Sequence, residues 1–222
     1  MKNERIQRNT KKTLTSGKIN KLAADCEELN IRGAVALHQE VYLRKISTHG
    51  HSSFRSLVKA EILRNTGACT IKGFCDIKEL SNAGQLKIHH GNITKVNSSG
   101  KLTVEQTLQV QQFDGIGVVK AKELQSGQFY LKLSGRSDIE QLTADEIRIE
   151  KDKLSISLFT NKKLVSKNIK GKHIQLSYTD AEIVNGDVVI IGDHCTIHTL
   201  YYRESYSISP KAKVQHIRRE EK

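Results

Sequence analysis

Proline, tryptophan and large aromatic rings are scarce in this sequence of 222 residues. There is one proline, there is no tryptophan, and only 5% of the residues are aromatic. Interiors built from stacked, repeated positions favour Ile, Leu, Val and Ala over large rings, so this composition is typical of a repeat protein. Cysteine is rare too. No C-x-x-C pair occurs among Cys26, Cys69, Cys75 and Cys195, which argues against a zinc ribbon or a thioredoxin-like motif.

Long apolar runs are missing as well. No stretch approaches the ~18 consecutive apolar residues that a membrane-spanning helix needs. The N-terminus has the positive charges of a signal peptide but no apolar segment after them, so we expect no secretion by that route. In such a chain the cysteines are expected to be reduced thiols rather than disulfides.

Positive charge exceeds negative charge, and the excess is concentrated near the two ends. The formal net charge is +12. Residues 1–24 hold seven Lys or Arg against one Glu, and residues 210–222 hold five against two. We therefore predict a basic disordered N-terminal tail at 1–24, a folded body at 25–209 and a basic C-terminal tail at 210–222.

Glycine recurs at a nearly constant interval through the first half of the chain. Successive intervals are 17, 17, 17, 16 and 17 residues. Apolar residues recur in the same register, such as Leu29, Ile46 and Leu63 four residues before a glycine. We expect each glycine to supply the positive φ of a turn. The repeat glycines are Gly33, Gly50, Gly67, Gly84, Gly100 and Gly117.

Around each glycine, apolar and polar residues alternate with the period of a strand. Seventeen residues of strand, glycine turn and strand are one coil of a solenoid. We predict an all-β fold, a single-stranded parallel β-helix (β-solenoid) with ~17-residue coils. After Ile139 the regular spacing is lost. We interpret the Lys-rich residues 151–170 as an insertion, after which further coils follow.

Catalytic and cofactor motifs are not found. The sequence has no G-x-x-x-x-G-K-[ST], G-x-S-x-G or H-E-x-x-H, and Lys120 stands where a dinucleotide-binding glycine would be needed after Gly117. Cys69 and Cys75 fall in apolar columns, which favours structural thiols over a metal site with the nearby His89 and His90. We predict no enzyme activity, no catalytic residue, no metal and no cofactor.

One short segment, Ile191 to Thr196, reads like a hexapeptide of the left-handed β-helix acyltransferases. Those enzymes need three hexapeptides in each coil, and residues 26–139 do not show them. A relative of these acyltransferases therefore remains an alternative function. A second alternative is a β-solenoid binding module that does not polymerise.

The glycine-spaced core and the segment Ala181 to Ile197, followed by Leu200 and Tyr202, resemble the bactofilins, which are polymer-forming bacterial cytoskeletal proteins. The closing segment is similar to that of the longer members found in bacilli. The chain differs from the common short members in its length and in the insertion at 151–170. The resemblance covers roughly residues 26–214.

The resemblance implies a right-handed β-helix and a cytoplasmic scaffold. Such a scaffold polymerises without nucleotide, often as a peripheral protein at the inner face of the cell membrane, and helps to position cell-envelope or motility machinery. Its partners would be further copies of itself, a paralogous bactofilin and an anionic membrane surface. Nucleic acid is not an expected partner.

The two ends of a solenoid lack a neighbouring coil, and such edges invite another chain. Association through both ends would produce an open filament. We expect the first and last coils to form these ends. The candidate polymer-end residues are Cys26, Leu29, Ile31, Leu37, Ile197, Leu200, Tyr201, Tyr202 and Tyr206.

The basic N-terminus and the insertion can also be interpreted as a membrane contact, because lysine and arginine are attracted to anionic lipid and Phe159 could enter the headgroup region. A solvated tail and nonspecific nucleic-acid contact are the other interpretations of the N-terminus. The candidate membrane-contact residues are Lys2, Arg5, Arg8, Lys11, Lys12, Leu158, Phe159, Lys162 and Lys163.

Overall fold

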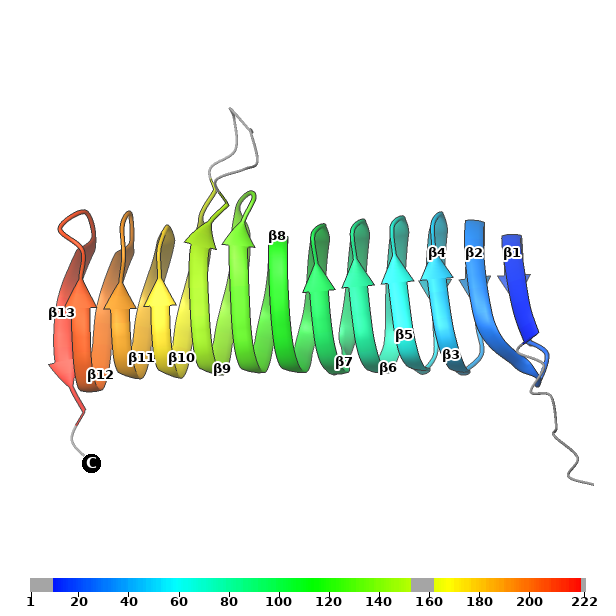
Figure 1. Cartoon of the computed structure of the whole chain (residues 1–222), viewed down its shortest axis with the longest axis horizontal. Helices are drawn as coiled ribbons and strands as arrows, with labels where there is room; N and C mark the ends of the chain where they lie inside the picture. Colours follow the sequence, from blue (N-terminus) through cyan, green and yellow to red (C-terminus); the bar gives the residue numbers. More distant parts are fainter. Residues whose placement is uncertain (1–9, 153–161, 221–222) are drawn as a thin grey trace, which may run out of the picture.

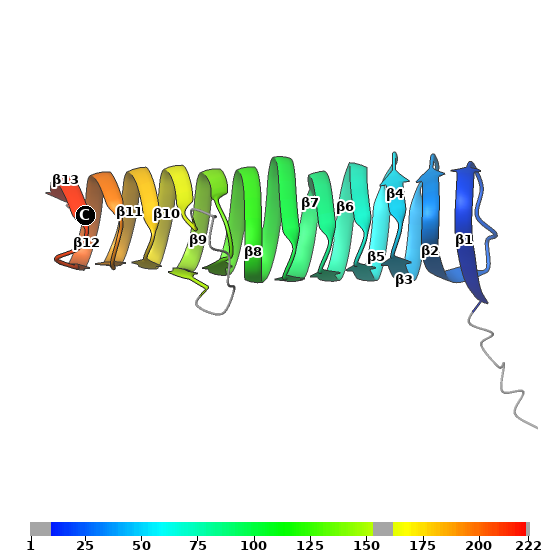
Figure 2. The same cartoon turned by 90° about the horizontal axis from the view of Figure 1, so that it is seen from above.

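The computed structural model describes residues 10–152 and 162–220. They form one parallel sheet of 13 strands, wound into a β-solenoid of about 12 turns. Figures 1 and 2 show a rod of stacked coils with β1 and β13 at opposite ends. No helix occurs in these two ranges. The predicted all-β solenoid with coils of about 17 residues is confirmed.

Most strands follow one another along the rod, and each hydrogen-bonds to the strands before and after it. β8 is long enough to run through the corners of more than one coil. The strands are β1 (Thr10–Ile19), β2 (Cys26–Leu37), β3 (Val41–Thr48), β4 (His51–Phe54), β5 (Val58–Asn65), β6 (Ala68–Asn82), β7 (Gln85–Ser98), β8 (Lys101–Leu133), β9 (Ser137–Lys151), β10 (Leu164–Leu176), β11 (Thr179–Ile191), β12 (Thr196–Ile208) and β13 (Lys213–Arg219).

Inward side chains line up in columns along the rod, as the sequence predicted. Leu63 of β5 pairs with Leu80 of β6, which pairs with Val96 of β7. We call the column that contains them the main column, and it continues from the first coil to the last. Its members are Lys12, Leu29, Ile46, Leu63, Leu80, Val96, Phe113, Phe129, Ile147, Ile174, Val189 and Tyr206.

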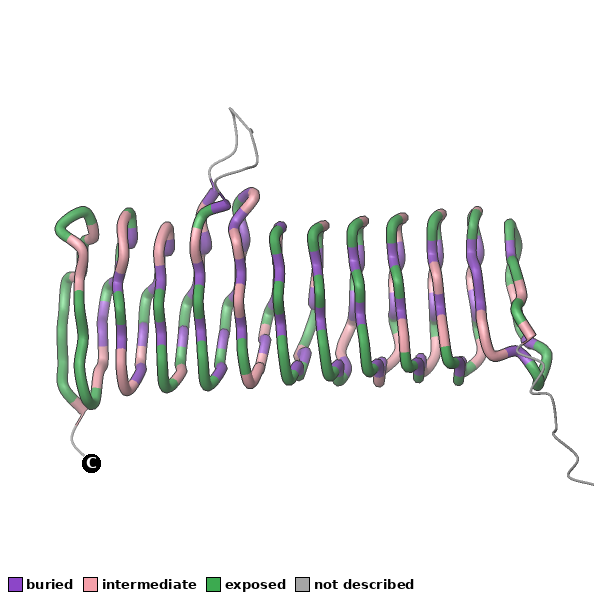
Figure 3. Tube along the Cα trace, in the orientation of Figure 1, coloured by how far each residue is buried: buried purple, intermediate pink, exposed green. Residues whose placement is uncertain are grey.

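The core lies inside the coils and extends along the whole axis, as the buried residues in Figure 3 show. Phe54, Phe113 and Phe129 are among its largest fully buried side chains. The rings of Phe113 and Phe129 stack with centroids 4.6 Å apart, close to the spacing of neighbouring strands. Apolar burial of this kind is the main stabilising contribution, at about 25 cal/mol per Å² of surface removed from water.

The repeat glycines are confirmed as a column, but the predicted reason for them is wrong. Within the described residues, the only glycine with positive φ is Gly17, at 112°. At Gly67 and Gly84 a Cβ atom would lie within 3.0 Å of the backbone of the preceding coil, at the carbonyl oxygens of Gly50 and Gly67 respectively. Glycine is therefore needed because the corners of successive coils approach too closely for a side chain.

A buried polar ladder beside the glycine column was not predicted. Thr48 Oγ1 donates to Asn65 Oδ1 at 2.7 Å, and Asn65 Nδ2 donates to Asn82 Oδ1 at 2.8 Å. Asn82 Nδ2 in turn donates to Ser98 Oγ at 3.0 Å. All four residues are buried. The ladder satisfies polar groups that would otherwise be costly in the core, because each amide bonds to the coils on both sides.

The predicted boundaries of the folded body need correction at both ends. Residues 10–19 form β1 and residues 213–219 form β13, so neither predicted tail is wholly outside the solenoid. The physical reason is packing: Leu14 is buried over Ile31, and Val214 is half-buried over Ile197.

The predicted insertion at 151–170 is also too long. Lys151 ends β9, and residues 164–170 belong to β10. Leu164 and Ile169 are completely buried and belong to the core rather than to an excursion. Leu142 of β9 pairs with Ile169 of β10, so β10 continues the stack in register with β9.

Candidate functional site at the two ends of the solenoid

The sides of the rod carry oppositely charged residues that pair between neighbouring coils. Lys78 lies 2.9 Å from Glu61 and Lys59 lies 3.3 Å from Asp76, in each case between neighbouring coils. Hydrogen bonding to Lys78 lowers the pKa of Glu61. Within residues 10–152 and 162–220, no group of three or more His, Cys, Asp or Glu could hold a metal ion. These charges favour the register of the coils, with a small stabilising effect because they are exposed.

The thiols and histidines considered for a metal site lie in different environments. All four cysteines are free and buried. His89 Nδ1 lies 3.1 Å from Glu105 Oε2 on the surface, and the His90 ring packs edge-on against Phe74. Burial raises the pKa of Cys69 to about 11 and that of Cys75 to about 12. Burial also raises the pKa of Cys195 to about 11. Such thiols act as small apolar side chains.

We predict that the native protein resists alkylation by iodoacetamide at about pH 8, while the urea-unfolded chain takes up one label on each of its four cysteines. The reason is that a thiol with a pKa of about 11 is roughly 0.1% ionised at that pH and is also inaccessible. Intact-mass spectrometry of the two samples measures the number of labels. Fast labelling of Cys69 or Cys75 in the native state would contradict the burial described here.

The N-terminal end is β1, because β1 pairs with β2 and, among the described strands, with no other. The predicted end residues Cys26, Leu29, Ile31 and Leu37 therefore do not form an end. They are covered by β1 through the pairs Thr10–Cys26, Lys12–Leu29, Leu14–Ile31 and Ile19–Leu37. No described strand pairs with the other edge of the β1 backbone.

The C-terminal end is formed by β13 together with the last residues of β12. The predicted end residues Ile197, Leu200, Tyr201 and Tyr202 are covered by β13, where they pair with Val214, Ile217, Arg218 and Arg219. Tyr206 lies beyond the covered part and remains 43% exposed, so its predicted place at the end is correct. Ile217 was not singled out from the sequence, and it is 41% exposed on β13.

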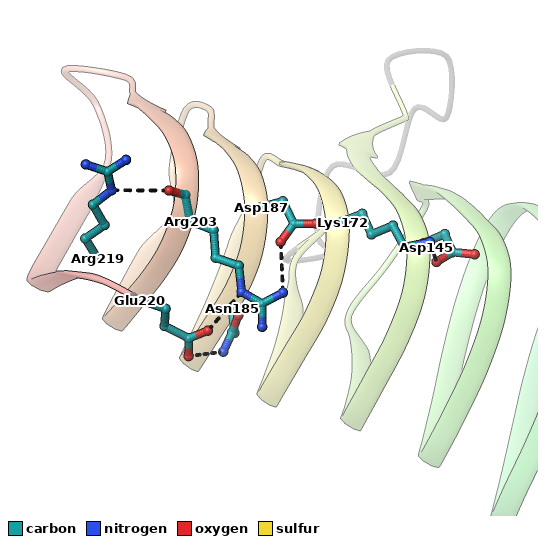
Figure 4. A network of polar contacts seen from close by, with 7 residues as sticks. All are labelled: Asp145, Lys172, Asn185, Asp187, Arg203, Arg219 and Glu220. Carbon is teal, nitrogen blue, oxygen red and sulfur yellow. Dashed lines mark hydrogen bonds and ion pairs between the residues drawn. The ribbon is translucent and has the colours of Figure 1, made fainter. Parts of the chain in front are cut away.

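Polar contacts attach the C-terminal end to the rod (Figure 4). Arg203 lies between two carboxylates, 3.2 Å from Asp187 Oδ1 and 3.4 Å from Glu220 Oε2. Asn185 Nδ2 donates to Glu220 Oε1 at 2.6 Å, and Arg219 Nε donates to the carbonyl oxygen of Arg203 at 3.3 Å. Because Glu220 follows β13 directly, these contacts hold that strand in place, although no described strand pairs with its outer edge.

Four of the candidate membrane-contact residues lie in the described part of the chain, and they do not form one basic patch there. Lys162 is buried, and its Nζ donates to the carbonyl oxygen of Asp152 at 3.0 Å, so the prediction that it contacts lipid is wrong. Lys163 forms an ion pair with Asp180. Lys11 is exposed on β1, whereas Lys12 is half-buried at the start of the main column. Outside the described residues lie Lys2, Arg5, Arg8, Leu158 and Phe159.

The described part of the chain contains no helix that could cross a bilayer. Comparison with protein-family models, curated proteins and solved structures gives no match for this chain. Its function must therefore be argued from its own residues. Within the described part of the chain, the two ends are where the strand pairing stops.

Proposed function

We propose that this protein is a non-enzymatic structural scaffold of the bactofilin type, which assembles through the ends of its solenoid without nucleotide. The observation that supports the proposal is the state of the two ends. Within residues 10–152 and 162–220, each terminal strand pairs along one edge only, and the apolar columns stop at partly exposed side chains such as Tyr206 and Ile217.

Unpaired strand edges and interrupted apolar columns both favour addition of another coil. A parallel strand placed on β13 would satisfy its free N–H and C=O groups and would cover Ile217. When two different surfaces of one molecule meet in this way, the contact leaves a free surface at each end of the pair, and growth continues as an open filament. No reaction on a bound nucleotide is needed for such growth.

Lys11 and Lys18, which are exposed on β1, support the proposed peripheral contact with an anionic membrane inside the cell. Each basic residue near such a surface contributes about 1 kcal/mol of attraction. In this proposal the filament positions envelope or motility machinery along the membrane, as the resemblance to the bactofilins implies.

Sedimentation velocity and negative-stain microscopy of the purified full chain test the proposal, without nucleotide and across a range of protein and salt concentrations. We expect rods of constant width whose length grows with protein concentration. Ile217→Asp should shorten them strongly, because a carboxylate would then be buried in the contact without a partner. Tyr42→Asp is the matched control, since Tyr42 is 59% exposed on the side of the rod.

A monomer under every condition would exclude the proposed function and would favour a solenoid that binds other molecules without polymerising. Equal effects of Ile217→Asp and Tyr42→Asp would show that the C-terminal end is not the contact.

A further inference from the structure

The two ends of this solenoid match each other column by column. The main column begins at Lys12 and finishes at Tyr206. A neighbouring column starts at Leu14, which lies over Ile31, and finishes at Ile208, which lies over Ile191. The inward positions at one end thus have counterparts at the other end.

A third column supports the match. It begins at Ile19, which pairs with Leu37, and it ends at Val214, which pairs with Ile197. Ile208 and Val214 are only partly buried and pack against the core, as Ile19 does at the other end. An added coil would complete the burial of these residues, and each would meet an apolar residue.

We infer that a second copy of this chain docks head to tail, with its β1 on the terminal turn formed by β12 and β13, and that like charge keeps this joint open at low ionic strength. The inference rests on the proposed function. It specifies how two copies are oriented and how the strength of their contact depends on ionic strength. In the joint, Leu14 of one copy lies over Ile208 of the next, and Ile19 lies over Val214.

The orientation follows from the strand directions. All strand pairs in this sheet are parallel, and each pair continues the columns of the one before. A two-fold contact would place β1 antiparallel to a second β1, or β13 antiparallel to a second β13, so that the columns would cross rather than continue. Only the head-to-tail contact adds a coil that resembles every other coil of the rod.

Two lysines on the outer surface oppose the contact between two copies. Lys18 begins the column of outward residues that runs through Ala36, and Lys213 ends it beyond Thr196. Gly117 lies directly on Gly100, which keeps this column in register within β8. In a head-to-tail joint, Lys18 would therefore lie directly opposite Lys213, about 4.8 Å from it along the axis. Like charges placed in this way are destabilising.

The other charges near the joint strengthen this effect. Lys11 and Lys12 of β1 would lie over Ser205 and Tyr206, and Arg218 and Arg219 add further positive charge to the terminal turn of the opposite end. The carboxylate of Glu220 is already engaged by Asn185 and Arg203, which leaves Asp25 and Glu204 as the other acidic side chains of the two terminal turns within the described residues. Salt shortens the range of the repulsion from about 30 Å at 0.01 M to about 8 Å at 0.15 M. Assembly should therefore increase with ionic strength.

Charge reversal tests the pairing of the two lysines. At about 0.02 M salt, Lys18→Glu or Lys213→Glu should each raise the association constant by about tenfold, because each replaces repulsion by attraction. The double variant Lys18→Glu/Lys213→Glu restores like charge at the joint, and its association constant should return towards the wild-type value. Sedimentation velocity measures assembly, and thermal melting verifies that each variant is folded.

The double variant distinguishes local repulsion between Lys18 and Lys213 from a general effect of the net charge on assembly. If the effect came only from a lower net charge, the double variant would assemble more readily than either single variant, and that result would overturn the inference. Single variants that behave like the wild type would overturn it as well.

Cysteine cross-linking tests the orientation independently. Thr13 and Ser207 are exposed and lie at the two ends of one outward column, next to the main column. In a head-to-tail joint they would be neighbours on adjacent strands, at a spacing compatible with a disulfide, for which Cα atoms lie about 4.4–6.8 Å apart. Under oxidation, the variant Thr13→Cys/Ser207→Cys should give a ladder of covalent oligomers.

The controls identify the other arrangements. Thr13→Cys alone should give no covalent oligomers, nor should Ser207→Cys alone, and the mismatched pair Thr13→Cys/Lys213→Cys should give little covalent product. A covalent dimer of Thr13→Cys alone would show a head-to-head joint, which overturns the inference but leaves the proposed function standing. If no variant assembles at any salt concentration, both fail.

Discussion

Gly67→Val is expected to lower the free energy of unfolding by about 4 kcal/mol or more, which is at the upper end of the effects of single substitutions. The Cβ atom at this position would lie within 3.0 Å of the Gly50 carbonyl oxygen and of the His49 backbone. Backbone atoms cannot move aside as the tip of a side chain can. The two coils would have to separate, which weakens strand pairing and packing together.

Urea denaturation followed by circular dichroism measures this effect. Gly135→Ala is the matched control, because its added Cβ would meet only a methyl group of Val118, at 3.0 Å. We expect Gly135→Ala to lower the free energy of unfolding by about 1 kcal/mol or less. Because the coils of a solenoid interact mainly with their neighbours, Gly67→Val should also broaden the transition as the two halves unfold separately. An equal decrease in the free energy of unfolding in the two variants would contradict the close approach of successive coils at the repeat glycines.

Asn65→Leu is expected to lower the free energy of unfolding by about 3 kcal/mol. Asn65 Oδ1 accepts hydrogen bonds from Thr48 Oγ1 and from the Gly67 backbone N–H, at 2.7 and 3.2 Å. Its Nδ2 donates to Asn82 Oδ1 at 2.8 Å and to the Gln85 carbonyl oxygen at 3.1 Å. Leucine has a similar size but leaves these buried partners unpaired, which is costlier than losing the hydrogen bonds alone.

Asn97→Ala is the control for this experiment. Asn97 precedes Ser98 of the ladder directly, but it is exposed on the outside of β7. We expect the free energy of unfolding to change by no more than about 0.5 kcal/mol at this surface position. Equilibrium unfolding at the same pH compares both variants with the wild type. A loss at Asn65→Leu no larger than the loss at Asn97→Ala would mean that the ladder contributes little to stability.

The columns could be read from the sequence because a solenoid repeats its packing at a fixed interval. Leu29, Ile46 and Leu63 recur every 17 residues, and the structure pairs them in that order. The amide ladder carried a similar signal, since Asn65 and Asn82 each stand two residues before a repeat glycine. That signal was missed because hydrophobic periodicity considers only apolar positions.

The later coils could not be read in this way because their length changes. Phe129 lies on Phe113 with an interval of 16 residues, whereas Ile169 pairs with Val184 at an interval of 15. Near Tyr178, which has a φ of 53°, a corner turns without a repeat glycine. A shorter coil can keep the inward columns aligned by removing corner residues, and such a change leaves no regular mark in the sequence.

The ends were misjudged for a different reason. A terminal coil has a neighbour on one side only, so it needs fewer apolar residues and can carry more charge than an inner coil. Residues 10–19 therefore resembled a polar tail, although Leu14 and Ile19 align with Ile31 and Leu37. A search for partial repeats beside the regular ones would have identified β1. The matching of Lys18 with Lys213 required the actual registers of all the coils between them.

In a filament of this protein, the connection between β9 and β10 would recur at a fixed spacing. β9 ends at Lys151 and β10 begins at Leu164, and the two strands lie next to each other in the rod (Figure 1). With about 12 turns and a rise of about 4.8 Å per turn, each copy would lengthen a filament by about 60 Å. The connection between β9 and β10 would thus appear once per copy, at regular intervals along the filament. The number of coils in one polypeptide would set the length of that interval.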